Sequence, residues 1–215
     1  ININQKKSIF TPVLIGGSLI LLISFAIRST FGLFQIPIAE QFLWARSEFS
    51  LAIAIQNLAW GIGTPIFSAF AEKYGDRKAI TIGLLFYALG VFISSTATTP
   101  EAHQTLNILI GFGIAGSGFG PILAVVGRSA SPEKRSLALG ITTAAGSAGQ
   151  VVGPPIAAIL LSLMPWPSVF VIFAIISLIT IILVPLLKSN PKIEKNKIEE
   201  NLSDALTTAL KDPTY

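Results

Sequence analysis

Cysteine is absent from this 215-residue sequence, and histidine and methionine occur once each. The lack of cysteine excludes disulfides, thiolate metal sites and cysteine nucleophiles. A single histidine, His103, cannot by itself form a histidine-based metal or catalytic site. We therefore expect neither a bound metal nor a cofactor.

Charged residues are also scarce, at 12% of the chain, whereas 18 glycines and a mean hydropathy of +0.71 are high. A soluble domain normally has about 25% charged residues. Long apolar runs account for the difference and predict a polytopic membrane protein surrounded by the lipid bilayer. The net charge of +4 does not indicate nucleic-acid binding, because the basic residues are concentrated in loops and the tail.

Six apolar segments are long enough to cross a bilayer as helices, and short polar loops connect them. The predicted spans are residues 12–38, 49–71, 79–97, 105–127, 136–163 and 166–187. All lysines and arginines except Arg28 and Arg46 lie in the N-terminal lead, the 72–78 and 128–135 loops, or the tail. This asymmetry predicts that these loops and both termini are cytoplasmic.

Residues 188–215 differ in composition from this six-helix domain of residues 1–187. They are polar and charged, and Ile198, Leu202, Leu206 and Leu210 recur within them at helical spacing. We predict a cytoplasmic linker that contains a short amphipathic helix.

Acidic side chains are missing from the predicted spans, since all 11 lie outside them. A membrane enzyme would need carboxylate pairs, histidine clusters or a Ser–His arrangement within the spans, so we expect that the protein is not an enzyme. A channel would need a re-entrant pore loop, and no connection is long enough to form one.

Arg28 is the single charged residue inside the predicted spans. A charge at bilayer depth costs at least about 2.5–3.5 kcal/mol on insertion scales, so it must face a polar interior or an aqueous cavity. One interpretation is a structural arginine satisfied by carbonyls of neighbouring helices. The other, which we favour, is a binding group for an anionic substrate, because a guanidinium can hold a carboxylate with two parallel hydrogen bonds.

Other polar side chains at mid-membrane depth could line a substrate path with Arg28. On the first span, Ser24 and Gln35 lie four residues before and seven after Arg28, which predicts one polar face. The candidates on the other spans are Gln56, Asn57, Trp60, Ser117, Thr143, Ser147 and Gln150. Each of these could instead make a hydrogen bond between helices.

A short internal repeat links the two halves of the membrane domain. Phe31-Gly32 recurs as Phe119-Gly120, and Ser50-Leu51-Ala52 recurs as Ser136-Leu137-Ala138. The first and second spans would then correspond to the fourth and fifth spans with opposite orientation. This predicts an all-α integral membrane fold built as an inverted three-plus-three repeat.

The loop between the second and third spans resembles the signature of the major facilitator superfamily, Gly-x-x-x-Asp-[Arg/Lys]-x-Gly-[Arg/Lys]-[Arg/Lys]. Glu72 stands for its acid, Lys73 for its base and Gly75 for its turn glycine. Ser68 replaces the first glycine, and Asp76 displaces the closing basic pair, Arg77 and Lys78, by one position. The resemblance implies a latch for the cytoplasmic gate, in which Arg128 is the expected partner of Glu72.

The fifth span is similar to the glycine–proline pattern of the same superfamily. It carries Gly140, Gly149, Gly153 and Pro154, although the final glycine pair is replaced by Ala157-Ala158. Small residues allow close helix packing, and Pro154 could bend the helix at a pivot. The arginine that drug exporters of the family carry in the fourth span is replaced by Asn107, which weakens a drug-exporter interpretation.

Residues 25–34 and 48–52 resemble bacterial monocarboxylate and oxalate–formate carriers. The resemblance implies a secondary transporter for a small organic anion that works by alternating access in the bacterial inner membrane. Protons or a counter-substrate are the implied coupling partners.

The resemblance covers the N-terminal six-helix half of a twelve-helix carrier. Three arrangements follow from this. The chain could pair with the missing C-terminal half, it could form a homodimer, or it could be a fragment without independent transport. A drug or other small-solute exporter of the same superfamily is the alternative function.

Overall fold

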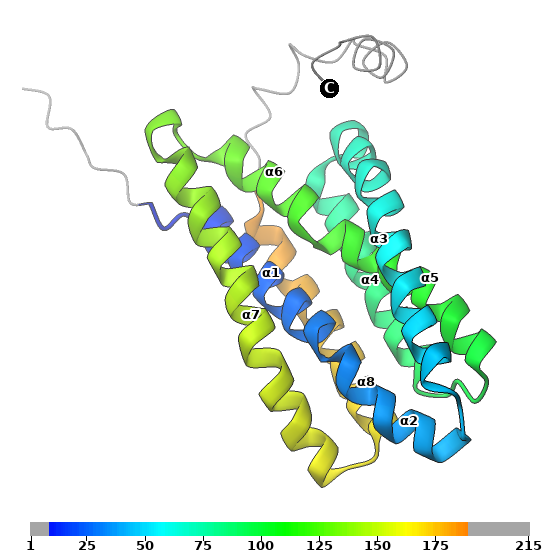
Figure 1. Ribbon diagram of the computed structural model, residues 1–215. Helices are drawn as coiled ribbons and strands as arrows, with labels where there is room; N and C mark the ends of the chain where they lie inside the picture. The colour runs from blue at the N-terminus through cyan, green and yellow to red at the C-terminus, as the bar shows by residue number, and fades with distance from the viewer. Residues whose placement is uncertain (1–8, 189–215) are drawn as a thin grey trace, which may run out of the picture.

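The computed structural model describes residues 9–188, and this part of the chain is helical with no strand (Figure 1). The first half contains α1 (Pro12–Thr30), the 3-10 helix η1 (Phe31–Phe34), α2 (Gln35–Phe42), α3 (Arg46–Tyr74) and α4 (Asp76–Ser94). The second half contains α5 (Pro100–Ser117), α6 (Phe119–Ser129), η2 (Pro132–Lys134), α7 (Arg135–Leu163), α8 (Trp166–Thr180) and η3 (Ile181–Leu186). The predicted amphipathic helix of the tail lies outside the described residues.

These elements form six helical units that are long and apolar enough to cross a membrane, which confirms the all-α six-span fold. The units are Pro12–Phe42, Arg46–Tyr74, Asp76–Ser94, Pro100–Ser129, Pro132–Leu163 and Trp166–Leu186. Short connections make successive units run in opposite directions, so their ends gather at two poles (Figure 1). We call the pole that carries the α3–α4 connection and Lys188 the basic end, and the pole that carries Met164 the opposite end.

Several helices begin before the predicted spans, because their first turns are polar. The second, third and fourth units start at Arg46, Asp76 and Pro100 rather than at 49, 79 and 105. The fourth start is capped by the Thr99 hydroxyl, which accepts a hydrogen bond from the Ala102 N–H at 3.3 Å. His103, which the hydropathy pattern places in a loop, therefore lies within α5.

The most extensive helix pairings are α1 with α7 and α3 with α5. An inverted repeat relates the first span to the fourth and the second to the fifth, so it converts one of these pairings into the other. The repeated Phe-Gly dipeptides also have equivalent places. Phe31 begins the 3-10 segment that interrupts the first unit, and Phe119 begins α6 after the break at Gly118 in the fourth unit.

Both pairings depend on glycines that allow the backbones to touch. A Cβ at Gly149 or Gly153 would overlap the carbonyl oxygen of Leu22 or Ala26 on α1. A Cβ at Gly111 of α5 would likewise overlap the carbonyl oxygen of Gln56 on α3. Small residues permit such contacts in membranes, where close van der Waals packing holds helices together.

The other members of the predicted fifth-span motif behave differently. Within residues 9–188, no atom of a neighbouring element lies within 4 Å of the place that a Cβ at Gly140 would occupy, so Gly140 makes no close helix contact there. α7 continues as one 29-residue helix through Pro154 and Pro155. The helix is therefore unbroken at Pro154, and the bend predicted there stays a prediction.

Alanine substitutions at these glycines distinguish two effects on stability, the loss of close helix packing and the gain in helix propensity. We expect Gly149→Ala and Gly153→Ala to destabilise the protein by about 1–3 kcal/mol, because the new methyl group must push α1 away from α7. Gly140→Ala should leave stability unchanged or slightly raised, since alanine is the better helix former. Thermal unfolding of the purified variants in one detergent measures both effects, and equal midpoints for all three would contradict the packing assignment.

Candidate functional site

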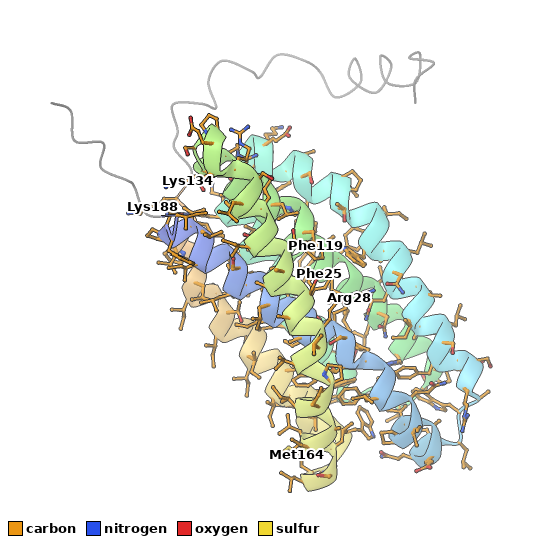
Figure 2. The ribbon with its side chains drawn as sticks, turned by 60° about the vertical axis from the view of Figure 1, so that its left-hand side comes forward. Phe25, Arg28, Phe119, Lys134, Met164 and Lys188 are labelled. Carbon is orange, nitrogen blue, oxygen red and sulfur yellow. The ribbon has the colours of Figure 1, made fainter. Side chains whose placement is uncertain are left out.

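Arg28 lies near the middle of the first helical unit and about half-way between the two poles. Figure 2 shows Arg28 beside Phe25 and Phe119, with Lys134 and Lys188 at the basic end and Met164 at the opposite end. The Arg28 side chain is partly buried. The α1 helix thus places a cation at the depth where the hydrocarbon core of a bilayer would lie.

Two side chains of α3 hold the guanidinium group. Nη2 of Arg28 donates a hydrogen bond to Oδ1 of Asn57 at 2.8 Å, and Nδ2 of Asn57 donates to the Ile53 carbonyl at 3.0 Å. The Arg28 Cζ lies 4.6 Å from the centre of the Trp60 ring, within the range of a cation–π interaction. Asn57 and Trp60 are three residues apart, so one face of α3 supplies both contacts.

The positive charge of Arg28 has no counter-ion within residues 9–188. Its side chain forms no ion pair there, and its Nε atom is buried without a hydrogen-bond partner. Arg28 donates to the side-chain amide of Asn57. A purely structural arginine, as in the first interpretation above, would donate to backbone carbonyls of neighbouring helices. The guanidinium therefore keeps hydrogen-bonding capacity and positive charge that residues 9–188 do not satisfy.

Aromatic side chains that the sequence analysis did not select surround this group. The Phe25 ring lies 5.8 Å from that of Trp60 and 4.5 Å from that of Phe119. Tyr87 of α4 is fully buried, and its hydroxyl donates to the Ser24 carbonyl at 3.2 Å. Helical spacing from Arg28 could have identified Phe25, and Tyr87 is the one tyrosine inside a predicted span.

Four of the predicted substrate residues make no hydrogen bond with Arg28 in the described part of the chain. Gln56 donates to Asn107 between α3 and α5 at 2.9 Å, and the Ser117 hydroxyl donates to the carbonyl of Gly113 one turn earlier at 2.9 Å. The Ser24 hydroxyl is buried and has no hydrogen-bond partner among residues 9–188. Gln35 donates to the Arg46 carbonyl at 3.3 Å, near the start of α3 at the opposite end.

Helix geometry explains the displacement of Gln35. The prediction extended one α-helical face from Arg28 to Gln35, but the 3-10 segment Phe31–Phe34 lies between them. A 3-10 helix has about three residues per turn, so it rotates the later side chains out of register with the α1 face.

Thr143, Ser147 and Gln150 share an exposed face of α7. Each follows one residue after a buried position of the stripe that packs against α1, namely Thr142, Gly146 and Gly149. The structure records no contact between this face and Arg28 within the described part of the chain, so their role as substrate contacts stays a prediction.

The loop between α3 and α4 contains an ion pair, but its acid is not the predicted one. Arg128, at the end of α6, pairs with the carboxylate of Asp76, whose side chain is almost completely buried. Glu72 lies on the exposed side of the last turn of α3. Gly75 has a φ of +96° and alone separates α3 from α4, so the chain turns at once and presents Asp76 to Arg128.

The remaining residues of this loop motif have mixed roles. Arg77 donates from Nη2 to the Pro185 carbonyl at 2.7 Å and from Nε to the Leu187 carbonyl at 3.0 Å. These two hydrogen bonds connect α4 to the end of η3.

The other three residues of the motif make weaker contacts within residues 9–188, or none of note. The Lys73 ammonium lies 5.2 Å from the centre of the Tyr74 ring. Ser68 faces Gly120, at whose position a Cβ would lie 3.4 Å from the Ser68 hydroxyl. Lys78 is exposed near the start of α4.

A family model described as "Major Facilitator Superfamily" matches residues 17–214. Among curated proteins, the chain is 28% identical over 155 residues to "Monocarboxylate transporter 13" of Bos taurus, covering 72% of this chain and 36% of that protein. It is 23% identical over 157 residues to "Probable L-galactonate transporter" of Escherichia coli (strain K12), covering 73% and 34%. It is 28% identical over 138 residues to "Multidrug resistance protein 3" of Bacillus subtilis (strain 168), covering 62% and 24%.

The fold also matches the crystal structure of a bacterial homologue of the human lysosomal transporter Spinster. The TM-score is 0.69 at 17% identity, and the match covers 94% of this chain and 49% of the other. The chain therefore spans about a third or less of the length of these curated relatives, and about half of the structural one.

The Asp76–Arg128 pair gives a direct test of the corrected loop assignment. We expect Asp76→Ala and Arg128→Ala each to lower stability by about 1–3 kcal/mol, because each leaves a largely buried partner unpaired. The double variant should lose less than the sum of the two, and Glu72→Ala should lose little. Thermal unfolding provides the measurement. Strict additivity of the two substitutions, or coupling of Arg128 to Glu72 instead, would contradict the pairing.

Proposed function

The chain belongs to the Major Facilitator Superfamily, and we propose on that basis that it forms the N-terminal six-helix half of a secondary transporter for a small organic anion. In this proposal Arg28 is the group that binds the anion, and Asn57 and Trp60 orient it. Transport would proceed by alternating access, with protons or a counter-substrate as the coupling partner.

The observation that carries this proposal is the uncompensated charge of Arg28. A guanidinium at mid-membrane depth is costly, and residues 9–188 offer it an amide and an indole ring rather than a carboxylate. A substrate carboxylate would supply the missing charge and accept the unused N–H groups in a low-dielectric setting, where such a contact is strong. The fixed Asn57 amide limits the rotation of the fork and so lowers the entropic cost of binding.

The names of the relatives fit this chemistry in part. Two are named for carboxylates, a monocarboxylate and L-galactonate. Another is named for multidrug resistance, which keeps export of a drug or another small solute as the alternative. The sequence favours the anion, because its predicted spans contain one base and no acid.

A second six-helix unit would be needed to close a central cavity around Arg28. The flanking helices α3 and α7 expose large apolar side chains that such a unit or lipid could cover, among them Leu58, Ile62, Val151 and Ile159. The C-terminal part of a longer protein or a second copy of this chain could provide it. Since no acid lies in these spans, a proton-coupling carboxylate would belong to that unit. We place the basic end on the cytoplasmic side of a bacterial inner membrane, following the distribution of lysine and arginine.

Binding of a panel of small carboxylates to the purified protein tests the role of Arg28. We expect one or more carboxylates to raise the thermal midpoint of the wild type. Arg28→Gln should abolish this stabilisation, and Arg28→Lys should weaken binding about tenfold or more because it loses the planar fork. Asn57→Ala should weaken binding less, since the charge is retained.

Arg46→Gln is the matched control, because it removes one positive charge from an exposed position near the opposite end. It should retain full anion binding. A carboxylate effect that survives in Arg28→Gln would exclude Arg28 as the binding group. Stabilisation by lipophilic cations or neutral drugs, with none by carboxylates, would favour the exporter alternative.

A further inference from the structure

A second charged feature lies at the basic end, remote from Arg28. An open pocket of about 350 Å³ is present where the α3–α4 turn meets the end of η3. Its lining residues are Tyr74, Gly75, Asp76, Arg77, Lys78 and Lys188. We call it the basic pocket. Segments more than 100 residues apart form it, because Arg77 holds the Pro185 and Leu187 carbonyls with two hydrogen bonds.

The charge of the basic pocket is strongly positive. Arg77, Lys78 and Lys188 contribute three cations, and Lys78 and Lys188 form no ion pair with any residue between 9 and 188. Asp76 is the one acid in the lining, and its charge is offset by Arg128 on α6. The two hydrogen bonds of Arg77 use Nε and Nη2, so its Nη1 donors stay available.

An apolar groove adjoins the basic pocket. This groove has a volume of about 280 Å³, mainly apolar walls, and a lining of Arg77, Lys78, Thr81 and Ile82. Arg77 and Lys78 border both spaces, whereas Thr81 and Ile82 lie one turn further along α4, away from the basic end. A cationic site at the pole of the bundle therefore continues into an apolar surface that runs toward the middle of the helices.

We propose that the basic pocket and the apolar groove together bind an anionic phospholipid. The headgroup phosphate contacts Arg77, Lys78 and Lys188, and the start of an acyl chain lies against Thr81 and Ile82. A soluble phosphate would satisfy the cations but leave the groove uncovered. Basic pockets at helix ends are suited to such headgroups, because the surface of an anionic leaflet concentrates negative charge there. The site is separate from Arg28 and shares no lining residue with the proposed substrate site.

The lipid would also strengthen the contacts that the loop motif makes with other helices. Arg77 joins α4 to the end of η3, and the preceding residue, Asp76, joins α4 to α6. A headgroup that bridges Arg77 and Lys188 adds a third link between the same elements. We therefore expect anionic lipid to stabilise the folded bundle more than a zwitterionic lipid does.

The test compares phosphatidylglycerol with phosphatidylcholine of the same acyl chains, added to the full chain purified in detergent. Native mass spectrometry counts bound lipid, and thermal unfolding measures stabilisation. We expect preferential binding of phosphatidylglycerol. The double variant Lys78→Gln/Lys188→Gln should weaken it about 25-fold, at about fivefold for each basic residue.

Two controls separate a specific site from general charge and from folding. Lys78→Arg/Lys188→Arg keeps both cations and should retain binding. Arg46→Gln/Arg135→Gln removes the same charge from exposed positions outside the pocket and should also retain it. The lipid-free thermal midpoint of each variant shows that it is folded.

Equal binding of the two lipids, or an equal loss in the Arg46/Arg135 variant, would overturn the proposal. Glycerol 3-phosphate carries the same phosphate chemistry without acyl chains, and should stabilise the protein little. If it protects the wild type as well as phosphatidylglycerol does, the pocket takes a soluble anion and the lipid assignment fails.

Discussion

The absence of water from the bilayer core is the constraint on which this structure depends. Each backbone N–H and C=O group there needs a partner within the protein, so the membrane part of the chain is helical. The hydrophobic effect does not drive two apolar helices together in lipid, so they associate through close van der Waals packing. Gly149 and Gly153 allow α7 to reach the backbone of α1, and Gly111 allows α5 to reach α3. These two helix pairings set the relative positions of the helices, and therefore of the side chains discussed below.

Arg28 departs from this constraint. The bundle places a guanidinium at mid-depth, holds it with Asn57 and Trp60, and provides no carboxylate within the described part of the chain. A natural protein that tolerates such a cost usually gains function from it. The centre of the Phe25 ring lies 6.0 Å from the Arg28 Cζ, and the Phe119 ring packs against Phe25. This uncompensated charge is the basis of the proposed anion site.

Charge at the basic end is organised differently, because water and headgroups lie close by. Asp76 and Arg128 join α4 to α6, while Arg77 joins α4 to the end of η3. The turn at Gly75 and the two residues after it thus link four of the six units, the second, third, fourth and sixth. Charged groups used in this way act as connectors between helices. Lys78 and Lys188 line the basic pocket and form no ion pair within residues 9–188, so they are the lysines that the proposed lipid would contact.

The sequence by itself determined the six-span helical architecture and the unusual status of Arg28. The length of an apolar segment and the position of charged residues are properties of the local sequence, and they determine which segments insert into a bilayer.

The tertiary structure alone decided which side chains meet. Asn57 and Gln56 are neighbours in sequence, yet one faces Arg28 and the other faces Asn107, because they point about 100° apart on α3. Asp76 rather than Glu72 pairs with Arg128 since the turn at Gly75 redirects the chain. The 3-10 segment removed Gln35 from the Arg28 face for a similar reason: side-chain direction depends on local backbone rotation, which residue spacing does not record.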